Sequence, residues 1–485
     1  MPEPNWSEAL PADVLRSIFS FCLDDRPSWS VLPLRNGSTD PRIIFLHVCS
    51  FWRAVALGAA ELWSSVIINL DSMPSDIPIS HEVLSRTNGA LLKVIVRMSR
   101  FQNQAPLQPS VGEFLDKIVV PFAQSLKALE LFVPFPFVKS IITLLHTGNI
   151  QFPALEALSL RQASAGAIVS HTFGGAVTGV ANPRDRLPCL KTVEFDVRCS
   201  ISLLADWASF PALTVPWSQL TTFVFLQTMP VRTFGDILSL CPGLKSCGVR
   251  LGRLGDPPSW FPQLLLPHLE RLHLRFSRLA EFDLFLKTCL QLPSIRDLAL
   301  KESDAGVAWT PILSDFLIDQ CGSSLESLFV SSTNRHHPID ANTVGFERFV
   351  QKHASTLREL YIPTFCWSHP INVDILRQLI SRELCPHLEK LSLDVSYWPA
   401  AGQDRLKMIV DAIKEAEHMK RGTLNKLYMF FHHWRQTSKM EPLILDSIKE
   451  VSYIPTKIYF RIFHSMIIAS TELVTLERNW FGYCV

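Results

Sequence analysis

The pattern L-x-x-L-x-L, in which other apolar residues can replace leucine, recurs along most of this chain. Its clearest copies start at Leu126, Leu155, Leu190, Leu220, Leu244, Leu269, Ile295, Leu325, Leu357, Leu388 and Leu424. Successive copies lie 24 to 36 residues apart, a spacing typical of repeat proteins in which each unit packs on its neighbours. Two weaker copies start at Trp63 and Leu91. We therefore expect a chain of 485 residues to form a long array instead of a single core.

Each copy predicts a short strand, and the segments between copies predict helices. Along Leu269–Arg275, apolar and polar residues alternate as in a strand with one buried face. Apolar residues three and four apart predict helices at Val231–Leu240, Ala280–Leu290, Pro311–Gln320, Phe346–His353, Val373–Arg382 and Asp404–Met419. The expected fold is α/β, an irregular solenoid with parallel strands on the concave face and helices on the convex face. A further apolar strand is expected near Ile458–Phe463.

Two short amphipathic helices are predicted before the array. Pro11 and Asp13 favour the start of the first helix. Its apolar residues are predicted to form one stripe: Val14, Leu15, Ile18, Phe19 and Cys22. The second helix has the same spacing at Phe45, Val48, Cys49, Trp52, Val55 and Ala56. The segment 24–41 between them is rich in turn residues and cannot continue a helix. Helices this short cannot bury all of their apolar surface, so part of it must meet the rest of the chain or a partner.

The N-terminal sequence resembles an F-box, particularly the F-box-like version common in fungal multigene families. The resemblance is carried by Leu10-Pro11, Val14-Leu15, Ile18-Phe19, Leu46, Val48-Cys49, Trp52-Arg53 and Leu62-Trp63. It implies docking onto the Skp adaptor of a cullin-RING ubiquitin ligase through Leu10, Pro11, Val14, Leu15, Ile18, Val48, Cys49 and Trp52. The segment 24–41 is longer than the link in a compact F-box. The alternative is that the two helices only cap the exposed end of the array.

The array itself is similar to the leucine-rich repeats of F-box plus leucine-rich-repeat proteins. The Asn or Cys that such repeats carry eight residues after their start is missing here, so the turns must form their hydrogen bonds otherwise. The resemblance divides the chain into a tail (1–8), an F-box-like motif (9–62), a leucine-rich-repeat solenoid (63–435) and a C-terminal cap (436–485). The segment from about 162 to 187, rich in Gly, Ala and Ser, is expected to be an insertion.

Residues two, four and six positions after each repeat start are expected to face out of the concave sheet. Early repeats place acidic residues there: Glu130, Glu194 and Asp196. Central repeats place cationic residues there, and later repeats place aromatic ones: Arg250, Arg271, His273, Arg275 and Lys301, then Phe329, Tyr361, Tyr428 and Phe430. We expect this surface to bind an acidic or phosphorylated segment of a client protein. The alternative is a solvated face that Asp297 and Glu302 partly neutralise.

The sequence favours a binding protein without cofactor or enzymatic activity. No metal-ligand spacing, nucleophile motif or nucleotide fingerprint occurs. A formal net charge of +1 argues against nucleic acid as the main partner. Eleven cysteines without framework spacing, and the absence of a signal peptide, indicate an intracellular protein of the cytoplasm, the nucleus or both. Apolar stretches are interrupted before they reach membrane-spanning length, so we expect a soluble protein. The competing functions are a repeat scaffold outside any ubiquitin ligase and an unrecognised hydrolase.

Overall fold

The chain is an α/β protein whose residues cluster into two compact units, Met1–Phe223 and Val224–Val485. The computed structural model describes residues 10–24, 30–32, 41–70, 76–87, 89–98, 111–147, 150–163, 183–196, 215–252, 263–276, 285–286, 289–302, 311–332, 343–362, 371–394, 411, 415, 426–431 and 457–462. The division between residues 223 and 224 falls inside the predicted array. The first unit therefore holds the N-terminal helices together with the first repeats.

Three helices open the first unit: α2 (Ala12–Asp24), α3 (Pro41–Val48) and α4 (Ser50–Gly58). The buried ring of Phe19 from α2 stacks on Phe45 of α3, with ring centroids 4.2 Å apart. The same ring meets Trp52 of α4 edge-on at 5.2 Å. A short 3-10 helix (Ala60–Trp63) follows, and the Trp63 indole N–H donates to the Ala56 carbonyl at 2.9 Å. These contacts join the three helices around one small aromatic core.

The single helix that the sequence predicts across residues 45–56 is wrong, because the backbone is extended at Cys49. The Cys49 thiol accepts the Trp52 N–H at 3.4 Å and so caps the start of α4. Between Asp24, where α2 ends, and Pro41, where α3 begins, the described residues are not helical, as predicted. It contributes the short strand β1 (Ser30–Leu32), which pairs with the first repeat and was not predicted.

The strands of the first unit are parallel and follow one another in sequence order. They are β1, β2 (Ser65–Asn69), β3 (Leu92–Arg97), β4 (Leu126–Val133), β5 (Ala157–Gln162) and β6 (Thr192–Asp196). Equivalent repeat positions pair across the sheet, as in the register Val94↔Leu129↔Leu158. All three of these side chains are buried. The apolar residue of each repeat therefore packs on the same residue of the next.

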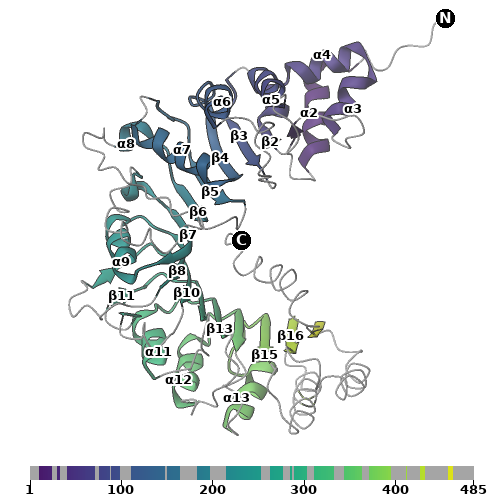
Figure 1. Ribbon diagram of the computed structural model, residues 1–485. Coiled ribbons are helices and arrows are strands. Elements are labelled where there is room, and N and C mark those ends of the chain that lie inside the picture. Colours follow the sequence, from purple (N-terminus) through teal and green to yellow (C-terminus); the bar gives the residue numbers. More distant parts are fainter. Residues whose placement is uncertain are drawn as a thin grey trace, which may run out of the picture. The chain divides into compact units, whose positions relative to one another are not determined.

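Helices fill the returns between these strands. They are α5 (Asp76–Ser85), α6 (Val111–Phe114) with the π-helical turn Leu115–Val119, α7 (Phe135–Thr147) and the short α8 (Pro183–Arg186). Helix α7 packs against β4 and β5, and α6 packs against α7 (Figure 1). The buried face of the sheet lies against these helices, which leaves the other face for polar side chains.

The second unit repeats the arrangement over more strands. These are β7 (Thr222–Met229, which begins two residues before the unit), β8 (Ser246–Leu251), β10 (Arg271–Phe276), β12 (Asp297–Glu302), β13 (Ser327–Ser332), β14 (Glu359–Ile362), β15 (Lys390–Asp394), β16 (Lys426–Phe431) and β17 (Lys457–Ile462). From β8 onward each strand pairs in parallel with the next one named. The register again aligns equivalent positions, as in Leu272↔Leu298↔Leu328↔Leu360.

Helices of the second unit are α9 (Val231–Leu240), α11 (Pro311–Asp315) with the π-helical turn Phe316–Gln320, α12 (Thr343–His353) and α13 (Ile371–Ile380). Helix α12 packs against both α11 and α13, and the three form one layer beside the strands (Figure 1). Two short strands that were not predicted, β9 (Leu264–Leu265) and β11 (Leu290–Gln291), pair with each other in parallel.

The sequence predicts most of these elements correctly. Every repeat start is followed within two residues by a strand, including the two weak copies. The helix at Val231–Leu240 matches to the residue, and the helix predicted from Pro311 is present but ends in a π-helical turn. The strand near Ile458–Phe463 is β17. Within the helix predicted over Ala280–Leu290, the described residues Phe285, Leu286 and Cys289 are helical, whereas Leu290 belongs to β11.

Several predictions lie wholly or mostly outside the described residues. These are the tail 1–8, most of the insertion 162–187, most of the helix Asp404–Met419 and the cap 436–485 apart from β17.

Hydroxyl side chains form hydrogen bonds between neighbouring repeats at three places in the second unit. Ser294 donates to the Pro267 carbonyl at 2.6 Å, and Ser324 donates to the Ile295 carbonyl at 3.0 Å. Thr356 donates to the carbonyl of Leu325 at 2.8 Å. Each hydroxyl lies directly before a repeat start and bonds to the preceding repeat. These bonds lie before the strands, and most positions eight residues after a repeat start lie outside the described residues.

Candidate protein-binding surfaces

Helix α2 carries two apolar stripes on different sides. Leu15, Phe19 and Leu23 form the buried stripe. The exposed stripe is Val14, Ile18 and Phe21, with Leu10 just before the helix, and the Phe21 side chain is 72% exposed. The prediction of one stripe is wrong, because apolar residues at these spacings occupy too wide an arc for one side of the helix to cover. A monomeric soluble protein seldom exposes such a row, so it is a candidate contact surface.

Helix α3 also exposes apolar residues, at Ile44 and Val48, one helical turn apart. Five of the predicted adaptor-contacting residues are therefore exposed: Leu10, Pro11, Val14, Ile18 and Val48. Cys49 and Trp52 are half-buried. Leu15 is fully buried, so its assignment to a contact surface is corrected here. Phe21 and Ile44 were missed, although continuing the three-and-four spacing from Leu10 finds Phe21.

In the first unit, the predicted acidic residues share one arginine. Arg161 on β5 forms an ion pair with Glu194 on β6 at 2.9 Å and with Glu130 on β4 at 3.9 Å. Ser159 donates to the same Glu194 carboxylate at 3.2 Å. Burial raises the pKa of the Glu194 carboxyl, and the hydrogen bond from Arg161 opposes this shift. This face is therefore less acidic than Glu130, Glu194 and Asp196 alone predict.

In the second unit, the predicted client-binding residues fall into two rows across the strands. The cation row is Arg250 on β8, Arg275 on β10 and Lys301 on β12, which pair in register. The second row, here called the aromatic row, is His273, Ala299, Phe329, Tyr361, Ser392 and Tyr428 in consecutive registered pairs. Arg271 precedes both rows on β10. The sequence predicts only that these residues share one face of the sheet, and the strand register shows which of them are direct neighbours.

Exposure differs along these rows. Arg271 and Arg275 are exposed, while Arg250 and His273 are half-buried. Lys301, Phe329 and Tyr361 are only 8%, 7% and 8% exposed, so the expectation that they project into solvent is wrong. The rings of Phe329 and Tyr361 lie 4.3 Å apart, and His273 Nε2 lies 3.3 Å from Asp297 Oδ2. Side chains on neighbouring strands cover one another, which alternation within a single strand cannot reveal.

Lys301 is the most perturbed cation of this face. Burial lowers the pKa of its ammonium to about 7, and the nearby charge of Arg275 adds to the shift. The side chain therefore exchanges its proton near neutral pH, unlike an ordinary lysine.

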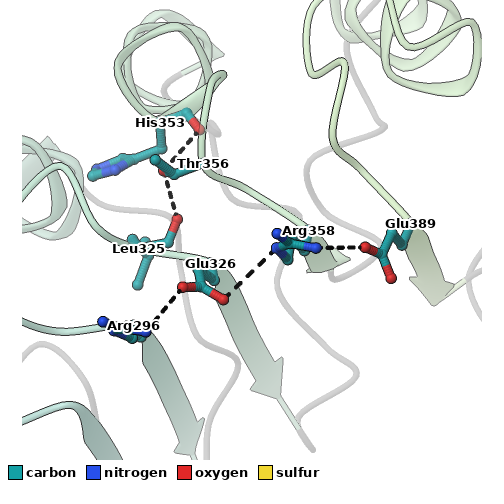
Figure 2. Close-up of polar contacts among 7 residues, drawn as sticks. All are labelled: Arg296, Leu325, Glu326, His353, Thr356, Arg358 and Glu389. Atoms are coloured by element: carbon teal, nitrogen blue, oxygen red, sulfur yellow. Dashed lines mark hydrogen bonds and ion pairs between the residues drawn. The ribbon is translucent and has the colours of Figure 1, made fainter.

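A ladder of alternating charges runs along the starts of the strands in the second unit. The residue after each repeat start alternates in sign through Lys245, Glu270, Arg296, Glu326, Arg358 and Glu389. Figure 2 shows its last four members, with Glu326 between Arg296 at 3.6 Å and Arg358 at 3.8 Å. Arg358 also contacts Glu389 at 2.8 Å.

Two shallow hollows lie along this charge ladder and share Arg296 and Ser324 in their walls. His268 lines the first and His387 lines the second. The sequence reading missed the ladder because it considered only the positions that face out of the strands.

The buried thiols are poor candidates for catalysis. Burial raises the pKa of Cys241, Cys321 and Cys385 to about 12, so each is protonated near neutral pH. Among the residues that the structure describes, no three His, Cys, Asp or Glu side chains come close enough to hold a metal ion.

Comparisons with known proteins assign no family: no family model matches the chain, and no curated protein matches it. Within the part of the chain that the structure describes, no helix has both the length and the apolar character needed to cross a membrane.

Proposed function

We propose that the chain is a non-catalytic substrate receptor of a Skp-cullin-F-box type ubiquitin ligase. In this proposal the N-terminal helices dock onto the Skp adaptor, and a leucine-rich-repeat solenoid holds a client protein. The observation that carries the proposal is the row of exposed apolar residues on α2 and α3, in a chain that continues as stacked repeats. Joining both partners through one chain raises their effective concentration, which is what ubiquitin transfer by other subunits needs.

The exposed stripe supports docking because it is apolar and rigidly held. Phe21, Ile18 and Val14 would each contribute roughly 1.5–3 kcal/mol if a partner buried them fully. The opposite side of α2 is fixed by Phe19, whose ring lies between Phe45 and Trp52. Little conformational entropy is therefore lost when a partner covers this surface.

The repeats support the solenoid part of the proposal. Within each unit the strands pair in the order of the repeats, and equivalent residues stack in register. Such arrays present long faces of regularly spaced side chains, which suit the binding of another protein. On the face of the second unit, exposed Arg271 and Arg275 favour an acidic or phosphorylated client segment.

A repeat scaffold outside any ubiquitin ligase is the second candidate. The contact that favours it is the bond from Trp63 to the Ala56 carbonyl, which fixes the helices directly before β2. Helices in that position also protect the first strands, as terminal caps do. A cap alone, however, gives no reason for the opposite side of α2 to be apolar.

A pull-down with the full chain separates the two candidates. We expect the wild type to recover the Skp adaptor and cullin, and the Val14→Ser, Ile18→Ser, Val48→Ser triple variant to lose both. The matched control is Leu240→Ser with Leu265→Ser, which removes exposed apolar residues from the second unit. Unchanged thermal melting of all three proteins excludes unfolding as the cause. Adaptor recovery by the triple variant, or no recovery by the wild type, would overturn the receptor proposal.

A further inference from the structure

The backbone of the charge ladder in the second unit is held in a regular row. Each member donates its N–H to the carbonyl of the member before it, at 2.7 to 2.9 Å: Glu270 to Lys245, Arg296 to Glu270, Glu326 to Arg296, Arg358 to Glu326 and Glu389 to Arg358. One step of the ladder is therefore one strand spacing, roughly 4.8 Å, and the whole ladder spans about 24 Å. The row follows the edge of the sheet at which the strands begin, here called the strand-start edge.

The side chains of the ladder are accessible. Four of them belong to exposed residues: Lys245, Glu270, Arg296 and Arg358. The side chains of Glu326 and Glu389 are 41% and 46% exposed. Among the residues that the structure describes, Lys245 and Glu270 take part in no ion pair. The first two members therefore have charge available for a partner.

The alternation of sign makes the ladder complementary to itself. The ladder has an even number of members, and it begins with a cation and ends with an anion. A twofold axis between Arg296 and Glu326 places the first member of one copy opposite the last member of the other. All six contacts then join opposite charges, in three pairs that each occur twice: Lys245 with Glu389, Glu270 with Arg358, and Arg296 with Glu326. A shift by one step, or a parallel arrangement in register, places like charges opposite each other.

Contact between two such ladders preserves the ion pairs within each copy. Arg358 lies between Glu326 at 3.8 Å and Glu389 at 2.8 Å (Figure 2). A second copy approaching from outside the sheet would add its own Glu270 as a third anionic neighbour. Every charge in the double row has opposite charges beside it and across from it, and like charges meet only diagonally. The interface therefore does not require any existing pair to break.

The turns beside the ladder match under the same symmetry. Two positions before the repeat start, each of these repeats has an exposed proline or serine: Pro242, Pro267, Pro293, Ser323, Ser355 and Pro386. The twofold axis places Pro293 opposite Ser323 and Pro267 opposite Ser355. Both prolines line the first hollow, and Ser355 lines the second. The larger rings of one copy would thus face the smaller side chains of the other, and the outermost pair joins two prolines.

From these observations we infer that the strand-start edge of the second unit is an interface between two copies of this chain, formed by antiparallel contact of their charge ladders. This inference is independent of the proposed function. A foreign protein would need the same alternation of charge, whereas a second copy has it by symmetry. Exposed ion pairs are individually weak, so the dimer should be weak and should dissociate as salt screens the charges.

Sedimentation velocity of the full chain tests this interface. We expect a monomer–dimer equilibrium between about 5 and 200 μM protein in about 50 mM NaCl, shifted to monomer in about 500 mM NaCl. Lys245→Glu places like charges opposite each other at two symmetry-related contacts, so it should weaken the dimer about tenfold or more. The matched control is Arg348→Glu on α12, which makes the same change of charge at an exposed residue outside the ladder and should dimerise as the wild type does.

Charge exchange between two variants tests the pairing directly. Glu389→Lys should also weaken its own dimer, because two lysines then face each other across the interface. In a mixed dimer of Lys245→Glu and Glu389→Lys, every contact again joins opposite charges, so the equimolar mixture should dimerise within about threefold of the wild type. The control mixture of Arg348→Glu and Glu389→Lys has the same net charges but keeps one pair of facing lysines. It should therefore associate several-fold more weakly.

Three results would overturn the interface. They are a wild type that stays monomeric over this range at low salt, a Lys245→Glu variant that dimerises as Arg348→Glu does, and a charge-exchange mixture no tighter than its control mixture. Thermal melting shows whether each variant is folded. If Glu389→Lys does not fold, the salt dependence and the Lys245→Glu result still decide the inference. Association that persists at high salt would indicate contact through the exposed apolar residues of α2, and it would also count against the ladder.

Discussion

Replacing Lys301 with methionine should stabilise the protein at neutral pH. Methionine has a similar length and no charge, so it fills the space of the buried side chain without its desolvation cost. The lysine pKa lies near 7 in the folded chain, against an ordinary value of 10.5. Each pKa unit corresponds to about 1.4 kcal/mol, and the folded state is half protonated at pH 7, so the buried amine costs about 4 kcal/mol there.

The sign of this effect follows from the lowered pKa. Between pH 7 and 10.5 the unfolded chain binds a proton at Lys301 that the folded chain has mostly lost. Stability of the wild type therefore rises with pH in this range, by about 1.4 kcal/mol per unit for this group. Methionine does not titrate. We expect Lys301→Met to be more stable by about 2–4 kcal/mol at pH 7, and the difference to shrink towards zero near pH 10.

Urea unfolding of both proteins at pH 7, 8 and 9 measures this difference directly, because other titrating groups cancel in the comparison. The exposed Lys245 provides the control, since Lys245→Met should change stability by no more than about 0.5 kcal/mol at any of these pH values. A Lys301→Met variant with unchanged or lower stability, or a difference that does not depend on pH, would refute the argument that burial of the amine is costly.

Two further predictions concern packing and acid stability. A Cβ at Gly322 would overlap the Pro293 carbonyl oxygen, so Gly322→Ala should lower the melting temperature by several degrees. The control is Gly58→Ala, whose Cβ would meet nothing closer than 3.9 Å, and this variant should leave the melting temperature unchanged or raise it. Equal melting temperatures of the two variants would contradict this packing argument. Burial lowers the pKa of His353, and the hydrogen bond between its ring and the Leu317 carbonyl at 3.1 Å opposes part of this shift. The neutral ring therefore stabilises the fold above about pH 6.5, and this contribution is lost as the pH falls below that value. Urea unfolding from pH 7.5 to 5 should show a steeper loss of stability in the wild type than in His353→Asn, and parallel curves would contradict it.

Strand positions were predictable because the array repeats one local pattern many times. The strand predicted after Leu269 is supported by the same pattern at Leu244 and Ile295, so a wrong assignment in one repeat does not change the strand positions predicted in the others. The helices had no such support. At Cys49 a single extended residue breaks a pattern that fits one continuous helix, and hydropathy spacing cannot detect that break.

Burial was less predictable than topology, because it depends on the side chains of neighbouring strands. Alternation places Phe329 and Tyr361 on the face opposite the buried leucines, and the register confirms that they are neighbours. Their rings then cover each other at 4.3 Å, which leaves little of either exposed. The same reasoning applies to Lys301, whose lowered pKa results from burial and could not be predicted from the residue type alone. The sequence thus predicts which residues lie on this face of the sheet, but not which of them are exposed to solvent.

The charge ladder shows how one position in each repeat can select the order of repeats without adding much stability. Its ion pairs are solvent-exposed, so each contributes roughly 0–1 kcal/mol. A misfolded array that omitted the strand after Arg358 would bring Glu326 beside Glu389, and like charges on adjacent strands repel. Correct stacking instead pairs Glu326 with Arg296 and Arg358, and pairs Arg358 with Glu389. Repeats with similar apolar cores need such a distinction, because their cores alone would also accept a neighbour out of order. The ladder therefore favours the observed order of the strands from β12 to β15 over one in which a repeat is skipped.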